Sequence, residues 1–175
     1  MPELGKRIVD RRTIALFGAF CLFLSTIEYM IPKPLPFMRI GIANLPLMLA
    51  LDLLPIPGFF LLAAIKVVGQ GLITGSLFSY IFLFSAVGTF ASAALMLLLR
   101  RSLGPRRIGF IGIGVIGALA SNLSQVLLAS VFIFGASAKY VAPPFLAAGL
   151  ITGIALGLFC EAFAERSLWY KARLR

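Results

Sequence analysis

Long apolar segments, separated by short charged clusters and by Pro or Gly breaks, follow one another along most of the chain. A transmembrane helix needs about 20 mainly apolar residues to cross a hydrocarbon core about 30 Å thick. The apolar runs predict spans near residues 13–31, 41–55, 57–75, 77–99, 109–135 and 142–165, of which the second is short. We therefore expect an all-α, integral membrane bundle of six transmembrane helices that forms one domain over residues 1–175.

The composition agrees with a membrane protein. Hydrophobic residues make up 61% of the chain and charged residues only 13%, with a mean hydropathy of +1.04, whereas soluble domains have about 25% charged residues. Cys21 and Cys160 both fall inside apolar segments, which favours buried free thiols over a disulfide. Histidine, the commonest metal ligand and general base, is absent. We therefore expect no metal site and no cofactor.

The basic residues gather in three clusters rather than along one soluble face. Four lie in the N-terminal segment, four between residues 100 and 107, and four between residues 166 and 175. The loops on the other side hold only Lys33, Arg39 and Lys139. Because an excess of Lys and Arg stays in the cytoplasm, both termini are predicted to be cytoplasmic, in the cell inner membrane. Membrane topology thus explains the net charge of +10 better than nucleic-acid binding does.

Lys66 lies within the third apolar run, where a charge costs about 2.5 to 3.5 kcal/mol on insertion scales. Such a group normally faces a protein interior or an aqueous cavity and meets a partner there. Gln70 follows four residues later and therefore shares its helix face. This pair marks the predicted binding site.

Asn122 and Gln125 form a second polar pair, three residues apart in the fifth span. At about 1.5 Å per residue they lie about 20 to 24 Å from the start of their helix, and Lys66 and Gln70 lie about 14 to 20 Å from theirs. The two pairs therefore occupy overlapping levels of the membrane. A structural alternative is that Asn122 and Gln125 cross-link helices through hydrogen bonds worth about 0.6 kcal/mol each.

Three further polar residues lie toward the outer surface: Glu28 ends the first span, and Arg39 and Asn44 begin the second. The connection at 32–36 contains three prolines, which stiffen it as a lid or rim. Together these groups predict a cavity that opens outward. Alternatively, Glu28 pairs with Arg39 or Lys66 and locks the helices together.

Small residues recur at helix-packing intervals. The fifth and sixth spans contain Gly114, Gly117, Gly149, Gly153 and Gly157, which let helix backbones approach closely in lipid. The first span carries a small-xxx-small patch, Ala15 and Ala19, in its cytoplasmic half. Since Ala19 and Glu28 are nine residues apart, about 100° per residue places them on opposite faces.

These motifs resemble the Gx transporter family, also known as heptaprenyl diphosphate synthase component I, whose members are similar to substrate-binding S components of energy-coupling factor (ECF) transporters. The matching pieces are 39–44, 66–71 with Gly75, and Gly117-Ala118 followed by Asn122 and Gln125. The family usually has a histidine before the position of Asn122, where this chain has Ser121. The resemblance implies that Ala15 and Ala19 dock on the ECF transmembrane coupling protein. It also implies that separate ATPase subunits hydrolyse ATP, which agrees with the absence of a phosphate-loop motif here.

We expect a membrane subunit that captures a small, partly apolar and partly anionic solute from outside. A flavin-like or other vitamin-type solute is the first candidate, and an isoprenoid or quinone precursor is the second. The expected substrate-binding residues are Lys66 and Arg39 for acidic groups, Gln70, Asn44, Asn122 and Gln125 for hydrogen bonds, and Glu28 for a cation or for fixing Lys66.

Two other functions remain open. The chain could be an autonomous secondary carrier in which Lys66 and Glu28 form an ion-coupled pair, or a non-catalytic membrane subunit of a prenyl diphosphate synthase or redox complex. Prenyl diphosphate synthesis needs clustered carboxylates to hold Mg²⁺ against diphosphate. Asp10 and Asp52 are the only aspartates, and the membrane segments contain no acidic cluster. The sequence therefore argues against an enzyme.

Overall fold

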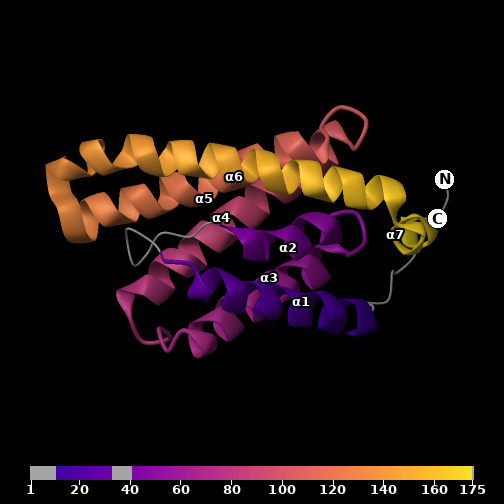
Figure 1. The fold of residues 1–175 in the computed structure, drawn as a ribbon, viewed down its shortest axis with the longest axis horizontal. Coiled ribbons are helices and arrows are strands. Elements are labelled where there is room, and N and C mark those ends of the chain that lie inside the picture. Colours follow the sequence, from indigo (N-terminus) through magenta and orange to yellow (C-terminus); the bar gives the residue numbers. More distant parts are fainter. Residues whose placement is uncertain (1–10, 33–40, 175) are drawn as a thin grey trace.

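The computed structural model describes residues 11–32 and 41–174, and this part of the chain is helical with no strand (Figure 1). The long helices are α1 (Arg11–Met30), α3 (Ile56–Ile73), α4 (Tyr80–Leu103), α5 (Phe110–Ala129) and α6 (Ala138–Arg166). The short elements are η1 (Ile42–Asn44), α2 (Leu45–Ala50), η2 (Ser130–Phe134), η3 (Gly135–Ser137) and α7 (Leu168–Leu174). The predicted all-α class is confirmed.

The helices have the length and surface of membrane spans. Helices α1, α3 and α4, and the continuous helical stretch Phe110–Arg166 that contains α5 and α6, are long and apolar enough to cross a bilayer. Large apolar side chains stay exposed on the outside of the bundle, among them Leu16, Phe23, Leu61, Leu127 and Ile151. Lipid rather than water explains such a surface. The chain is a multi-pass membrane protein.

The second predicted span is shorter than expected. η1 and α2 contain three and six residues, which at 1.5 Å per residue give about 14 Å, roughly half of the hydrocarbon thickness. All six residues of α2 are buried. The segment that the sequence marked as the short second span thus contains a short buried helix. An apolar run signals burial, but it does not distinguish burial in protein from burial in lipid.

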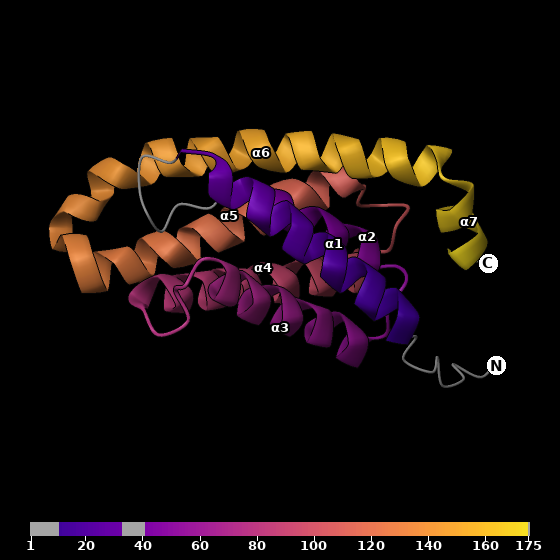
Figure 2. The same cartoon turned by 60° about the horizontal axis from the view of Figure 1, so that its bottom comes forward.

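The two ends of the bundle differ in charge. The start of α1, the connection between α4 and α5, and α7 lie at one end in both views (Figures 1 and 2). We call this the basic end, because it holds Arg11, Arg12, Arg100, Arg101, Arg106, Arg107, Arg166, Lys171 and Arg173. The opposite end contains the corner between α5 and α6. There Gly135 has φ 52° and ψ −132°, backbone angles that suit only glycine.

Helices α5 and α6 pack with their backbones in contact. A Cβ atom on Gly153 would lie only 2.7 Å from the carbonyl oxygen of Gly114, and one on Gly157 would overlap the backbone of Ile111. Close packing at these glycines is therefore confirmed. Because neither helix can move closer or carry a larger residue here, the contact fixes the spacing of two pocket walls.

An ion pair between the buried Arg100 and the partly buried Asp52 lies at the basic end. Arg100 of α4 donates to both carboxylate oxygens of Asp52, at 2.9 and 2.5 Å, and to the carbonyl oxygen of Ile108 at 2.5 Å. The hydroxyl of Tyr170 in α7 donates to the carbonyl oxygen of Leu49 at 3.1 Å and lies 3.4 Å from Asp52 Oδ2. These contacts join α2, α4 and α7.

Candidate ligand-binding site

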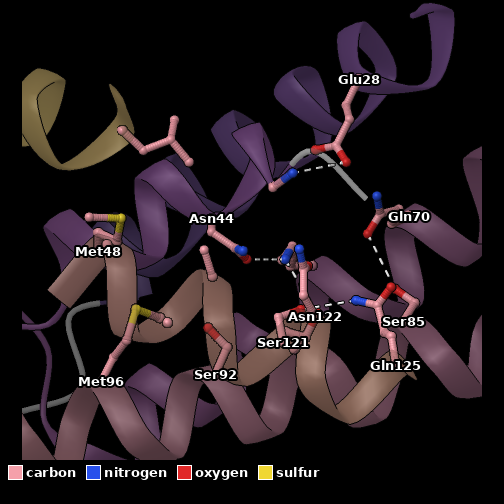
Figure 3. Close-up of a pocket in the computed structure, with 17 residues that line it drawn as sticks. Glu28, Asn44, Met48, Gln70, Ser85, Ser92, Met96, Ser121, Asn122 and Gln125 are labelled. Atoms are coloured by element: carbon pink, nitrogen blue, oxygen red, sulfur yellow. Dashed lines mark hydrogen bonds between the residues drawn. The ribbon is translucent and has the colours of Figure 1, made fainter. Parts of the chain in front are cut away.

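A buried pocket lies among α1, η1, α2, α3, α4, α5 and α6 (Figure 3). Its lining is Glu28, Gly41, Asn44, Met48, Lys66, Gln70, Ser85, Thr89, Ser92, Met96, Gly114, Gly117, Ala118, Ser121, Asn122, Gln125 and Leu156. Six of the seven predicted substrate-binding residues are in this set. The seventh, Arg39, lies outside the described residues, as does most of the Pro-rich connection.

Lys66 is only 4% exposed, and its side chain enters the pocket from α3. The Nζ ammonium donates to the amide oxygen Oδ1 of Asn44 and to the hydroxyl of Thr89, which is 3.3 Å away. An ammonium has three donors and must exchange water for other acceptors when it is buried. These two neutral oxygens provide such acceptors from η1 and α4.

Glu28 is 1% exposed and faces the start of the short helical segment η1 and α2. Its carboxylate accepts the backbone N–H groups of Gly41 at 3.2 Å and Ala43 at 3.3 Å. The first N–H groups of a helix have no partner within the helix, and a carboxylate suits that positive end. Gly41, with φ 91°, allows the left-handed turn that presents these groups. Glu28 therefore fixes the η1 turn beside the pocket.

The two glutamines bond to hydroxyl groups inside the pocket. Gln70 Oε1 accepts a hydrogen bond from Ser85 at 3.5 Å, and Gln125 Nε2 donates to Ser121 Oγ at 3.0 Å (Figure 3). Ser121 positions the Gln125 amide by accepting this hydrogen bond. Both glutamines are at least 98% buried, so these contacts form away from lipid.

Asn122 both lines the pocket and joins two helices. Its Nδ2 donates to the carbonyl oxygen of Phe145 in α6 at 2.8 Å, and a Cβ atom on Gly149 would overlap this amide. The contact is the helix cross-link that the structural alternative predicts. Asn122 therefore has a packing role in addition to its place in the pocket.

The sequence analysis missed a row of hydroxyl groups on α4. Ser85, Thr89 and Ser92 all line the pocket, and their spacing of four and three residues places them on one helix face. That polar row was visible in the sequence.

The open space within the pocket is small. Its volume is about 20 Å³, which is room for about one water molecule. The polar side chains have thus converged on one another in this conformation. A solute larger than water can bind only after side chains or the η1 turn move outward.

The Ala15 and Ala19 patch lies on the opposite side of α1. Both alanines are exposed, whereas Glu28 points inward, which confirms the predicted opposite faces of Ala19 and Glu28. Ala19 also lines an apolar groove of about 400 Å³ with Leu16, Phe17, Phe20, Phe23, Leu49, Phe163 and Trp169. The outer face of α1 is therefore apolar around Ala19.

Comparison with known proteins agrees with the predicted family. The family model for heptaprenyl diphosphate synthase component I matches residues 17–163. No curated protein and no solved structure matches the chain. The matched range contains most of the chain and all the pocket residues, so the predicted family is confirmed. The chain belongs to the heptaprenyl diphosphate synthase component I family.

Proposed function

We propose that this protein is the substrate-binding membrane subunit of an ECF-type importer, which captures a small solute from outside the cell. The observation that carries the proposal is the convergence of Glu28, Asn44, Lys66, Gln70 and Gln125 on one buried pocket. A buried ammonium, a carboxylate and several amides are costly to keep in a purely structural membrane bundle. Their arrangement suits recognition of a solute by charge and hydrogen bonds.

The proposed orientation has the basic end in the cytoplasm, with both termini on that side and six membrane-crossing or membrane-embedded segments. The grouping of arginines at the basic end supports this orientation by the positive-inside rule. The Asp52–Arg100 ion pair lies at that end, while Glu28 and Gly41 lie toward the other. The pocket would therefore fill from the outside while the cytoplasmic end stays closed.

The family name refers to a component of a prenyl diphosphate synthase, and we propose a non-catalytic role for this chain. The described residues contain Glu28, Asp52, Glu161 and Glu165 as their acidic groups, and no three of them gather as a metal-binding cluster. Glu28 accepts two backbone N–H groups and Asp52 pairs with Arg100. These contacts leave no carboxylate set suited to a magnesium diphosphate complex.

Partners would supply the energy for transport. The exposed Ala15 and Ala19 would contact a transmembrane coupling protein, and separate ATPase subunits would hydrolyse ATP. Small residues support this surface because they let two membrane helices approach closely. The apolar groove beside Ala19 gives the partner helix further contact area.

Co-purification and transport assays together test the proposal. The tagged chain is expressed with its native partners, purified in mild detergent and examined for ATPase subunits, and the complex is then assayed in liposomes for ATP-dependent uptake. Stable capture and ATP-dependent uptake are expected. Uptake by the chain alone, without ATP, would instead establish an autonomous carrier. If no ATPase is captured, no uptake is measured and a prenyl diphosphate synthase subunit is stably captured, the accessory-subunit alternative is favoured.

A further inference from the structure

The pocket lining is polar and contains no aromatic ring among the described residues. Ten of the lining side chains carry a charge, an amide or a hydroxyl, and the apolar members are Met48, Met96, Ala118 and Leu156. Sites for ring systems are usually lined by apolar and aromatic side chains with only a few polar groups. An isoprenoid chain would also offer no hydrogen-bonding partner to the polar atoms that face it, which is costly in a buried pocket.

Two buried polar atoms in the pocket lack a hydrogen-bond partner within the described part of the chain. They are the amide oxygen Oε1 of Gln125 and the hydroxyl oxygen of Ser92, both on side chains only 1% exposed. A buried acceptor without a donor is destabilising, so native proteins normally satisfy it. The pocket has room for about one water molecule when empty, and a bound solute would replace that water with its own donor.

Helix packing limits how far the pocket can widen. A Cβ atom on Gly88 would lie 2.7 Å from Gln125 Nε2 and 2.9 Å from Ser121 Oγ, so α4 and α5 are already close there. Helices α5 and α6 are in backbone contact at Gly114 and Gly153. The flexible thioethers of Met48 and Met96 can change rotamer, and they offer the space for a compact solute.

On the basis of the function proposed above, we propose that the solute is a compact polar acid that carries at least one N–H or O–H donor, and is neither a flavin nor an isoprenoid. The Lys66 ammonium binds the acidic group in place of Asn44, because a charge-assisted hydrogen bond is stronger than one to an amide. Gln125 Oε1 accepts the donor of the solute, and Ser92 contributes its hydroxyl. Gln125 and Ser92 thereby determine specificity.

Thermal unfolding of the full chain in lipid nanodiscs tests this assignment. The probes are riboflavin, geranyl diphosphate, and a set of compact acids made up of the common amino acids and short hydroxy acids. At a concentration of about 100 times the dissociation constant, a cognate acid should raise the unfolding temperature by about 5 to 10 °C. Stabilisation by riboflavin or geranyl diphosphate, or no response to any compact acid, would overturn the proposal.

Variants connect the response to the named atoms. Gln125→Leu should weaken binding of the stabilising acid at least tenfold. If this variant does not fold, Ser92→Ala is the alternative variant, because it is a smaller change in structure. Ser124→Ala on the same helix is the matched control, because its hydroxyl bonds to the Ala120 carbonyl and does not line the pocket. Unchanged affinity in a folded Gln125→Leu protein would contradict the role of Gln125. These results are independent of ATPase capture, so a wrong solute class and a wrong transporter type are distinguished.

Discussion

Lys66 and Asn44 are joined by a hydrogen bond across the pocket, from the ammonium on α3 to the amide oxygen beside the start of α2. The bond connects the buried charge to the η1 turn, which Glu28 holds from the other side through Gly41 and Ala43. In the proposal made above, an acidic solute takes the place of Asn44 on Lys66. Binding is therefore linked to a change in the contacts that hold this turn.

Replacement of Lys66 by methionine should abolish solute retention and leave a folded, monodisperse protein. Methionine is unbranched and flexible enough to fill the space, and it carries no ammonium whose burial costs free energy. Losing the charged partner of a buried acid should cost at least about 2 kcal/mol of binding free energy, or roughly thirtyfold in affinity. Mass spectrometry of retained small molecules, with size-exclusion chromatography, measures both effects.

The matched control is Lys139→Met, which removes an exposed lysine from the opposite end of the bundle. It should retain solute as the wild type does. Full retention by Lys66→Met would mean that the Lys66 charge is structural, and the proposed site would then be wrong.

A larger residue at Ala19 should prevent partner docking and leave the pocket unchanged. The side chain of Ala19 is exposed on α1, so Ala19→Leu keeps the helix intact but separates it from an approaching partner helix. Captured ATPase should fall severalfold while solute retention stays constant. Ala147→Leu makes the same change at an exposed position of α6 and should capture normally. If the Ala19→Leu and Ala147→Leu proteins capture equal amounts of ATPase, α1 is not the docking surface.

The Asp52–Arg100 ion pair should contribute strongly to stability. Arg100 is buried, and Asp52→Asn leaves its guanidinium without the opposite charge. Breaking a buried pair in this way costs about 3 kcal/mol or more, which thermal unfolding in detergent would detect. The exposed Glu165→Gln removes one acidic charge without breaking that pair and should have little effect. If the two variants unfold at the same temperature, the pair is not a major source of stability.

The sequence was sufficient to predict two polar pairs of the pocket, because the signals that mark them are local. Lys66 with Gln70 and Asn122 with Gln125 lie at helical spacing in apolar runs, so each pair was assigned to one helix face. The length of the runs and the distribution of arginines then placed the pairs at similar depth. The structure agrees in bringing these four side chains into one pocket.

Contacts between distant segments could not be predicted in the same way. The contacts of the Glu28 carboxylate with the backbone N–H groups of Gly41 and Ala43 were not foreseen in the sequence. Those donors exist because the chain forms a short helix there, and the apolar run did not reveal its length. The small pocket volume likewise depends on how side chains pack in three dimensions.

Tyr170 should make stability depend on alkaline pH. Burial, and then the neighbouring Asp52 carboxylate, raise the pKa of its hydroxyl above the ordinary value of about 10. Since the folded protein holds this proton more tightly than the unfolded chain, the stabilisation is complete below about pH 10 and is lost as the pH rises through the higher folded pKa.

Tyr170→Phe should lower the free energy of unfolding by about 1 kcal/mol at neutral pH through loss of the bond to Leu49. Tyr170→Phe should also lose less stability above pH 10 than the wild type does. The control is Tyr140→Phe, because the Tyr140 side chain is 74% exposed. This control should change neither the free energy of unfolding at neutral pH nor its loss above pH 10. Chemical denaturation over this pH range measures the difference, and parallel curves for the wild type and Tyr170→Phe would contradict the assigned role.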